Sequence, residues 1–288
     1  VGMVFQNYSL FPHMNIFENV AFPLKMRNIN KTKIKDKVHY ALDLVRLKDF
    51  DLRMPHELSG GQRQRVAFAR AIVFEPKVLL MDEPLGALDL KLRERMQIEI
   101  KRYHKEIGCT VIYVTHDQGE ALTLSDRIVI MNEGKIIQID NPNNIYDKPT
   151  SKFSANFIGE TNIFNIKYKH HENEHFIEFE NIQTNKEEYS VSSLNNIPNL
   201  EYKFISVRPE KFKIYDGQLD INKNYLVCFN LIINEIIFLG DVIKYICLND
   251  NNYEIILKIT RTDLSHIFKI NEKIKVSFDI KEAVFLSI

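Results

Sequence analysis

The first 150 residues alternate between short apolar runs and segments whose apolar residues recur at helical spacing. Over 15–50, apolar residues recur every three or four positions with lysine-rich faces between them, which predicts a helical subdomain over about 13–58. Further along, the pattern predicts helices and strands in turn. The predicted helices are 62–74, 89–107 and 117–124, and the predicted strands are 78–81, 110–114, 127–131 and 135–139. Such alternation is typical of a parallel sheet covered by helices, so we expect an α/β domain over 1–150.

The pattern changes after residue 151. Apolar and polar residues then alternate with a period of two, as in 234–247 and 253–259, with turn residues between the runs. This pattern predicts an all-β domain over 151–288. The composition is globular, with 45% hydrophobic and 26% charged residues, which excludes a disordered or fibrous chain.

Charge and cysteine content narrow the class of protein further. The 38 basic residues balance the 38 acidic ones, so no net positive field would draw the chain to nucleic acid, and we expect no nucleic-acid partner. Cys109, Cys228 and Cys247 have no C-x-x-C spacing, which argues against a zinc site or a disulfide framework and favours a reducing cytosol. The apolar stretch 231–248 is broken by charged residues and does not predict a membrane span.

The sequence starts within an apolar run. Residues 1–5 read as a strand with no turn or capping signal ahead of it, and the first residue is Val1 rather than Met. We therefore expect the N-terminus to be truncated.

The most distinctive motif lies at the start of a predicted helix and consists of Leu58, Ser59, Gly60, Gly61 and Gln62. Two glycines allow close approach of a ligand to the backbone, and a helix N-terminus offers unpaired N–H groups and a positive dipole end to an anion. The motif therefore predicts a phosphate-binding segment. The alternative interpretation is an ordinary serine N-cap that follows a turn.

Polar side chains follow three of the predicted strands. Asp82 and Glu83 come directly after the strand 78–81, His116 follows the next strand, and Gln6 follows the first apolar run. Ligands of parallel α/β sheets sit at the carboxyl ends of the strands, so we expect these side chains to converge on one crevice. Asp82 suits a magnesium ion bound to phosphate, and Glu83 suits the activation of water. The alternative for the two carboxylates is a pair of exposed loop residues.

Together these motifs resemble those of ATP-binding cassette (ABC) ATPases, and they occur in the family's order. The resemblance makes Gln6 the Q-loop glutamine, 58–62 the signature motif, 78–83 the Walker B strand, 87–89 the D-loop and His116 the switch histidine. It implies a partial P-loop NTPase domain with a helical subdomain.

The resemblance extends to the second domain and to one group of importers. Three C-terminal motifs resemble the OB-like, TOBE-type β-barrel of importer ATPases: 157–160, 207–210 and 238–241. The segments that most resemble the ATPase subunits of spermidine/putrescine importers are 4–24, 91–124 and 157–164. Iron(III), sugar and glycerol-phosphate importers have similar ATPases and stay open as alternatives.

The resemblance implies ATP and Mg²⁺ as cofactors and assigns roles to particular residues. The implied catalytic residues are Glu83, which would polarise the attacking water, and His116, which would contact the γ-phosphate. The implied nucleotide-binding residues are Gln6, Ser59, Gly60, Gly61, Gln62, Asp82 and Asp89. Of these, Gln6 and Asp82 would also face Mg²⁺.

The implied partners are a second ATPase subunit or a second copy of the chain, integral membrane permease subunits, and an extracytoplasmic solute-binding protein. The chain would then be peripheral, at the cytoplasmic face of the inner membrane. Residues 11–14 lie where family members receive the membrane subunits. Alternatively, Phe11, Met14 and Phe17 pack the helical subdomain.

One part of the family pattern is missing from these residues. The only Gly-Lys pair, Gly134 and Lys135, does not continue as a phosphate-cradling Walker A loop. We therefore expect the chain expressed alone not to hydrolyse ATP. This leaves open a catalytically incompetent fragment or accessory subunit. A soluble cassette ATPase of translation or repair, and an oligonucleotide-binding barrel, are further alternatives, and the charge balance gives the latter little support.

Overall fold

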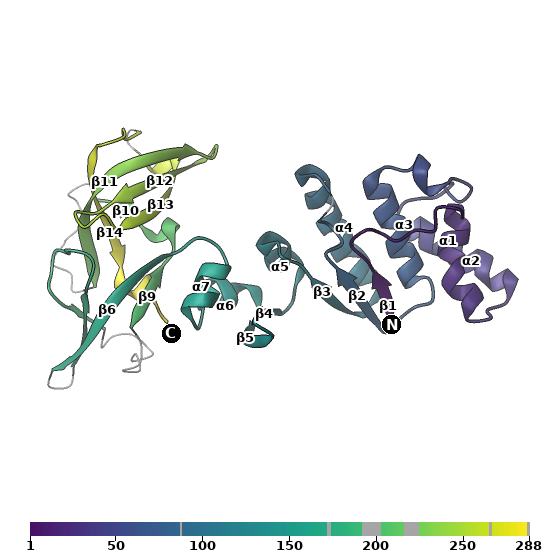
Figure 1. Cartoon of the computed structure of the whole chain (residues 1–288), viewed down its shortest axis with the longest axis horizontal. Helices are drawn as coiled ribbons and strands as arrows, with labels where there is room; N and C mark the ends of the chain where they lie inside the picture. Colours follow the sequence, from purple (N-terminus) through teal and green to yellow (C-terminus); the bar gives the residue numbers. More distant parts are fainter. Residues whose placement is uncertain (87, 172–173, 192–202, 216–224, 265–266, 287–288) are drawn as a thin grey trace. The chain divides into compact units, whose positions relative to one another are not determined.

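The computed structural model describes residues 1–86, 88–171, 174–191, 203–215, 225–264 and 267–286 (Figure 1). The chain divides into two compact units, Val1–Asp126 and Arg127–Ile288. The first unit is α/β and the second is rich in β-strands, which confirms the predicted fold class. The predicted domain boundary after residue 150 falls inside the second unit and stays a prediction.

The first unit is built on a three-stranded parallel sheet with the strand order β1-β2-β3. The strands are β1 (Gly2–Val4), β2 (Val78–Asp82) and β3 (Thr110–Val114). The helices are α1 (Ile16–Met26), α2 (Lys31–Leu44), α3 (Gly60–Ile72), α4 (Leu90–Ile107) and α5 (Gln118–Leu124), with a 3₁₀ turn at Pro55–Glu57. Because all three strands run in the same direction, their carboxyl ends meet at one edge of the sheet.

Each of these helices begins at a side chain that caps its first turn. The five N-cap residues are Asn15, Asn30, Ser59, Asp89 and Asp117, and each accepts a hydrogen bond from a backbone N–H of its helix. Such caps stabilise helix starts by satisfying N–H groups that have no partner within the helix. They also fix where the chain turns from each strand or loop into the next helix.

Helix α3 packs closely on the sheet. Val66, Ala67 and Ala69 of this helix have no exposed surface. A Cβ atom built on Gly2 would lie 2.4 Å from the carbonyl oxygen of Ala71, so only glycine permits this approach of β1 to α3. Small residues on both sides thus set the spacing between helix and sheet.

The second unit begins with the antiparallel hairpin of β4 (Ile128–Asn132) and β5 (Lys135–Asp140), followed by α6 (Pro142–Asp147) and α7 (Lys152–Phe157). The buried guanidinium of Arg208 binds the carbonyl oxygens of Tyr146 at 2.8 Å, Ala155 at 3.1 Å and Glu160 at 3.2 Å. These bonds tie α6 and α7 to the β-rich part of the unit.

The remaining described strands form two five-stranded sheets. One sheet has the order β10-β14-β11-β12-β13, with β10 (Lys213–Ile214), β11 (Leu226–Phe238), β12 (Val242–Leu248), β13 (Glu254–Thr260) and β14 (Lys273–Asp279). The other has the order β15-β9-β6-β7-β8, with β6 (Asn162–His171), β7 (Glu174–Phe179), β8 (Tyr189–Ser190), β9 (Phe204–Val207) and β15 (Val284–Leu286).

The two sheets share one apolar core. Phe164 of one sheet stacks on Phe278 of the other with their ring centroids 6.0 Å apart. Within the described residues, the strands pair as two open sheets and not as one closed barrel. The prediction of a β-rich C-terminal region is therefore confirmed, although the range 151–288 also contains helix α7, and the described strands form two open sheets in place of the barrel that the resemblance implied. Alternation of apolar and polar residues specifies strands and faces but not whether a sheet closes on itself.

No helix in the described parts of the chain is long and apolar enough to cross a bilayer.

Candidate functional site

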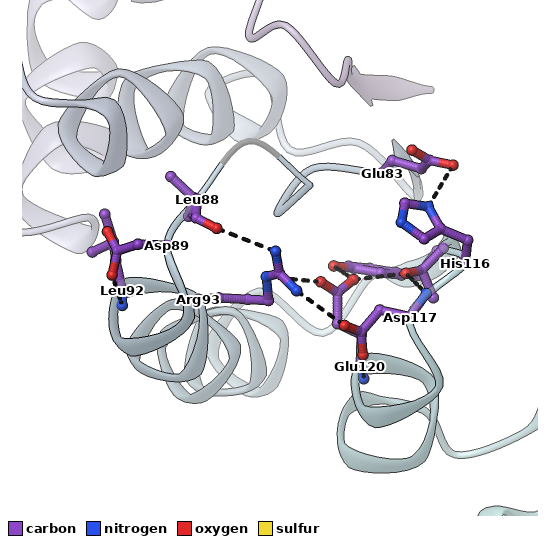
Figure 2. Close-up of polar contacts among 10 residues, drawn as sticks. Glu83, Leu88, Asp89, Leu92, Arg93, His116, Asp117 and Glu120 are labelled. Atoms are coloured by element: carbon purple, nitrogen blue, oxygen red, sulfur yellow. Dashed lines mark hydrogen bonds and ion pairs between the residues drawn. The ribbon is translucent and has the colours of Figure 1, made fainter. Parts of the chain in front are cut away.

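Three polar side chains predicted from separate segments meet at the carboxyl edge of the parallel sheet. Gln6 Nε2 donates to Glu83 Oε2 at 3.0 Å, and His116 Nδ1 lies 3.0 Å from Glu83 Oε1. Figure 2 shows the imidazole of His116 directed at the carboxylate. The side chain of Glu83 is 28% exposed and that of His116 is 74% exposed. The structure therefore brings Gln6, Glu83 and His116 together at a solvent-accessible position.

Glu83 has an unusual backbone. Its φ is 42°, in the left-handed region that residues other than glycine rarely adopt. Its N–H donates to the carbonyl oxygen of Val114 at 2.9 Å, which holds the residue beside the end of β3. Strained backbone of this kind persists where surrounding contacts fix it, and it clusters at functional sites.

The charge of Glu83 acts on His116. The hydrogen bond and the negative charge of Glu83 raise the pKa of His116, desolvation opposes this rise in part, and the carboxylates of Glu120 and Asp117 add to it. The imidazole is therefore protonated over a wider pH range than an unpaired histidine. A protonated imidazole at this edge favours the binding of an anion.

The segment that follows Gln6 is held by buried side chains that the sequence analysis missed. Tyr8 and Ser9 both have a positive φ, and the buried guanidinium of Arg70 donates to their carbonyl oxygens at 2.9 Å and 2.8 Å. Burial lowers the pKa of Arg70. The available signal was an arginine within the apolar run of α3, because a buried charge requires partners.

Asn19 of α1 holds the next part of the same segment. It has no exposed surface, its Oδ1 accepts from the N–H of Phe11 at 2.8 Å, and its Nδ2 donates to the carbonyl oxygens of Phe11, Met14 and Asn15 at 3.1, 2.9 and 3.0 Å. The side chains of Phe11, Met14 and Phe17 are half-buried, so they pack in part and stay accessible in part.

The segment 58–62 forms a separate group at the start of α3. Ser59 Oγ accepts from the N–H of Gln62 at 3.3 Å, and Gln62 Oε1 accepts from the N–H of Ser59 at 2.8 Å. This capping box is the structure that the alternative interpretation, an ordinary serine N-cap, predicts. A Cβ atom on Gly61 would lie 3.1 Å from Leu92 of α4, so this glycine also permits close packing, whereas one on Gly60 would lie 3.6 Å from Leu88, an ordinary contact distance. The phosphate role of Ser59, Gly60, Gly61 and Gln62 stays a prediction.

The two aspartates of the prediction are both exposed. Asp82 is the last residue of β2, and Asp89 Oδ1 accepts from the N–H of Leu92 at 3.0 Å as the cap of α4. Of the predicted D-loop, Ala87 lies outside the described residues. The described ranges contain no group of three or more His, Cys, Asp or Glu side chains arranged to hold a metal ion. Magnesium is commonly bound by one or two carboxylates together with phosphate and water, so the exposed carboxylate of Asp82 fits such a group.

An arginine that the sequence analysis missed lies between the segment that contains Leu88 and the loop that contains Asp117. Arg93 of α4 contacts Leu88, Asp117 and Glu120 (Figure 2). The sequence offered one signal for this region, because Asp117 and Glu120 have the spacing of a capping box at a helix start. The side chain of Glu120, however, turns to other partners and not back to the helix start.

Comparisons with known proteins identify the family of the chain. A family model described as ABC transporter matches residues 1–86. The spermidine/putrescine import ATP-binding protein PotA of Thermotoga maritima is 40% identical over 272 residues, which cover 93% of this chain and 71% of the relative. The protein of the same name from Borreliella afzelii is 57% identical over 169 residues, 59% of this chain and 49% of the relative. That of Pseudomonas aeruginosa is 46% identical over 248 residues, 85% of this chain and 66% of the relative.

The α/β first unit contains the matched range 1–86, and the relative from Thermotoga maritima extends the similarity over 93% of the chain. The chain belongs to the ABC transporter family of ATP-binding proteins. Within that family it is similar to spermidine/putrescine import ATP-binding proteins, as the sequence resemblance predicted. The chain spans 49% to 71% of the length of these relatives.

Proposed function

We propose that this chain is the ATP-hydrolysing part of an ABC importer and that it drives the uptake of polyamines, spermidine or putrescine. The single observation that carries the proposal is the convergence of Gln6 and His116 on the two carboxylate oxygens of Glu83. The relatives named above support the choice of polyamine as the cargo.

In this proposal Glu83 is the general base. Bound Mg²⁺ and ATP supply the phosphoanhydride bond that is cleaved and the cation that spreads the charge of its phosphate oxygens. Glu83 orients and polarises water, and each of its oxygens keeps acceptor capacity beyond the one partner that it has in this structure. Gln6 and His116 orient the carboxylate from its two oxygens.

The remaining predicted residues bind and orient. Asp82 holds the magnesium ion, and His116 in its protonated form attracts the terminal phosphate. The start of α3 faces a phosphate held by a second subunit, where the dipole of this 13-residue helix favours an anion. The residues proposed for that contact are Ser59, Gly60, Gly61 and Gln62, with Asp89 on the adjoining segment.

We further propose that the chain works with a second ATPase subunit, with membrane permease subunits and with a solute-binding protein, as a peripheral protein at the cytoplasmic face of the membrane. The permease contact is proposed at Phe11 and Met14, whose side chains are half-buried and so stay accessible in part. The second, β-rich unit corresponds in this proposal to the TOBE-type domain of importer ATPases.

The test is uptake by cells of the source organism in which the gene is deleted. Labelled spermidine, putrescine, iron(III), a sugar and glycerol phosphate are supplied in turn, and the deletion is complemented with the complete reading frame. We expect the wild type to restore polyamine uptake and Glu83→Gln to fail. Glu75→Gln, which alters an exposed glutamate that pairs with Lys37, is the matched control and should restore uptake fully. Restoration of another cargo in place of polyamine would contradict the proposed substrate.

A further inference from the structure

The two residues that flank His116, Thr115 and Asp117, are held in place by hydrogen bonds. Thr115 Oγ1 donates to Glu120 Oε2 at 2.8 Å and accepts from the N–H of Asp117 at 3.0 Å. Asp117 Oδ1 in turn accepts from the N–H of Glu120 at 2.9 Å. Glu120 is only 2% exposed and also accepts from the hydroxyl of Tyr113 at 2.8 Å. Thr115 is therefore tied to the buried carboxylate of Glu120, and Asp117 is tied to Thr115 and to the backbone N–H of Glu120.

Arg93 links this anchored loop to a second segment. Its Nη1 donates to Asp117 Oδ2 at 3.0 Å and its Nη2 donates to the carbonyl oxygen of Leu88 at 3.2 Å, while its Nε lies 3.9 Å from Glu120 Oε1, an ion-pair distance without a hydrogen bond. Figure 2 shows the guanidinium between Leu88 on one side and the two carboxylates on the other. The planar guanidinium presents several donors in fixed directions, so it holds the Leu88 carbonyl and the Asp117 carboxylate at a defined separation.

The side chain of His116 has little packing of its own. It is 74% exposed, and its ion pair with Glu83 lies at the protein surface. Exposed ion pairs are weak because holding two side chains in one geometry costs conformational entropy. The 3.0 Å distance between His116 and Glu83 therefore depends on where the backbone of 115–117 is held.

We propose that Arg93 and Glu120 are positioning residues that hold His116 against Glu83 by fastening the His116 loop to the Leu88–Asp89 segment. A displacement of the Leu88 carbonyl then moves Arg93 and, through Asp117, moves His116. The proposal rests on the proposed ATPase function for its importance, but the contact itself can be tested without ATP.

The first test is the titration of the His116 imidazole by NMR in the full 288-residue chain, with the signal assigned from His116→Asn. Glu83, Asp117 and Glu120 are the carboxylates that raise its pKa, and Glu83 contributes most. Arg93→Gln removes a cation, and by charge alone this can only raise the pKa of His116. Loss of positioning separates His116 from Glu83 and lowers the pKa toward the value found in Glu83→Gln. The two explanations predict opposite signs.

We expect the pKa of His116 to fall in Arg93→Gln and to stay unchanged in the matched control Arg102→Gln. Arg102 lies on the same helix and pairs with Glu106 at 3.8 Å. If Arg93→Gln does not fold, as judged by its helical circular dichroism, Thr115→Val takes its place. This uncharged change removes the bond to Glu120 and should also lower the pKa. An unchanged or raised pKa in the folded variant overturns the proposal.

The second test asks whether Arg93 acts through His116 during turnover. In the product of the complete reading frame, we expect Arg93→Gln to lower kcat at least about tenfold, as a misplaced group does, with KM for ATP little changed. In a His116→Ala background the same change should have no further effect, because the residue that it positions is gone. Equal losses in both backgrounds overturn the positioning role. If the wild type hydrolyses no ATP, the ATPase proposal fails, and the NMR titration alone decides the positioning role.

Discussion

The Asn19→Ala substitution removes the side chain that organises the segment after Gln6. Its amide makes four hydrogen bonds to backbone groups of Phe11, Met14 and Asn15, and the side chain has no exposed surface. Each such bond contributes about 0.5 to 1.5 kcal/mol net, and an unpaired buried N–H costs about 1 to 3 kcal/mol. Because the loop can relax and admit water, we expect a loss of about 3 kcal/mol in the free energy of unfolding of the first unit.

Denaturant unfolding followed by circular dichroism at the helical wavelength measures this loss, since the longer helices lie in Val1–Asp126. The matched control is Asn7→Ala, at an exposed position of the same segment, and it should change the free energy by less than about 0.5 kcal/mol. A loss for Asn19→Ala no larger than that of the control would refute the reasoning. Asn19→Asp adds a sign test. The carbonyls facing Nδ2 raise the pKa of the new carboxyl in the folded state, so this variant should gain stability as the pH falls.

Three further outcomes are expected. Gly2→Ala places a Cβ atom 2.4 Å from the Ala71 carbonyl oxygen, so thermal unfolding should show a loss of about 1 to 3 kcal/mol from overpacking. The pKa of His116 is raised in the folded state, so its pairing with Glu83 stabilises the protein at pH values below the pKa of the unfolded state. This stabilisation is lost as the pH rises through the pKa of the folded state. The difference in Tm between wild type and Glu83→Gln should therefore shrink as the pH rises through the folded-state pKa. Arg208→Met removes a buried guanidinium with three carbonyl partners, and should destabilise Arg127–Ile288 by about 3 kcal/mol while the helical transition of Val1–Asp126 is unchanged.

The convergence of Gln6, Glu83 and His116 was predictable because each follows a strand of a parallel sheet, and strand direction alone places their side chains at one edge. The starts of α3 and α4 were predictable within two residues because Ser59 and Asp89 are strong N-caps. Local sequence is sufficient for both features.

The supporting contacts could not be predicted in the same way. Arg70 binds carbonyls 61 and 62 residues away, and the tertiary fold selects such partners, because every residue offers the same carbonyl group. The sequence around Arg93 likewise indicates an exposed helical arginine, and only the packing of α4 against α5 brings it to Asp117. Period-two alternation also left open whether the C-terminal strands form one barrel or two sheets.

The most direct test of the central claim is Mg²⁺-dependent ATP hydrolysis by the product of the complete reading frame that contains these residues, in the wild type and in Glu83→Gln. We predict that Glu83→Gln lowers turnover at least about 10²-fold, as expected for loss of a general base, while ATP binding is retained and Glu75→Gln turns over at the wild-type rate. Turnover by Glu83→Gln at the wild-type rate would contradict the assignment of Glu83, together with Gln6 and His116, as the catalytic centre.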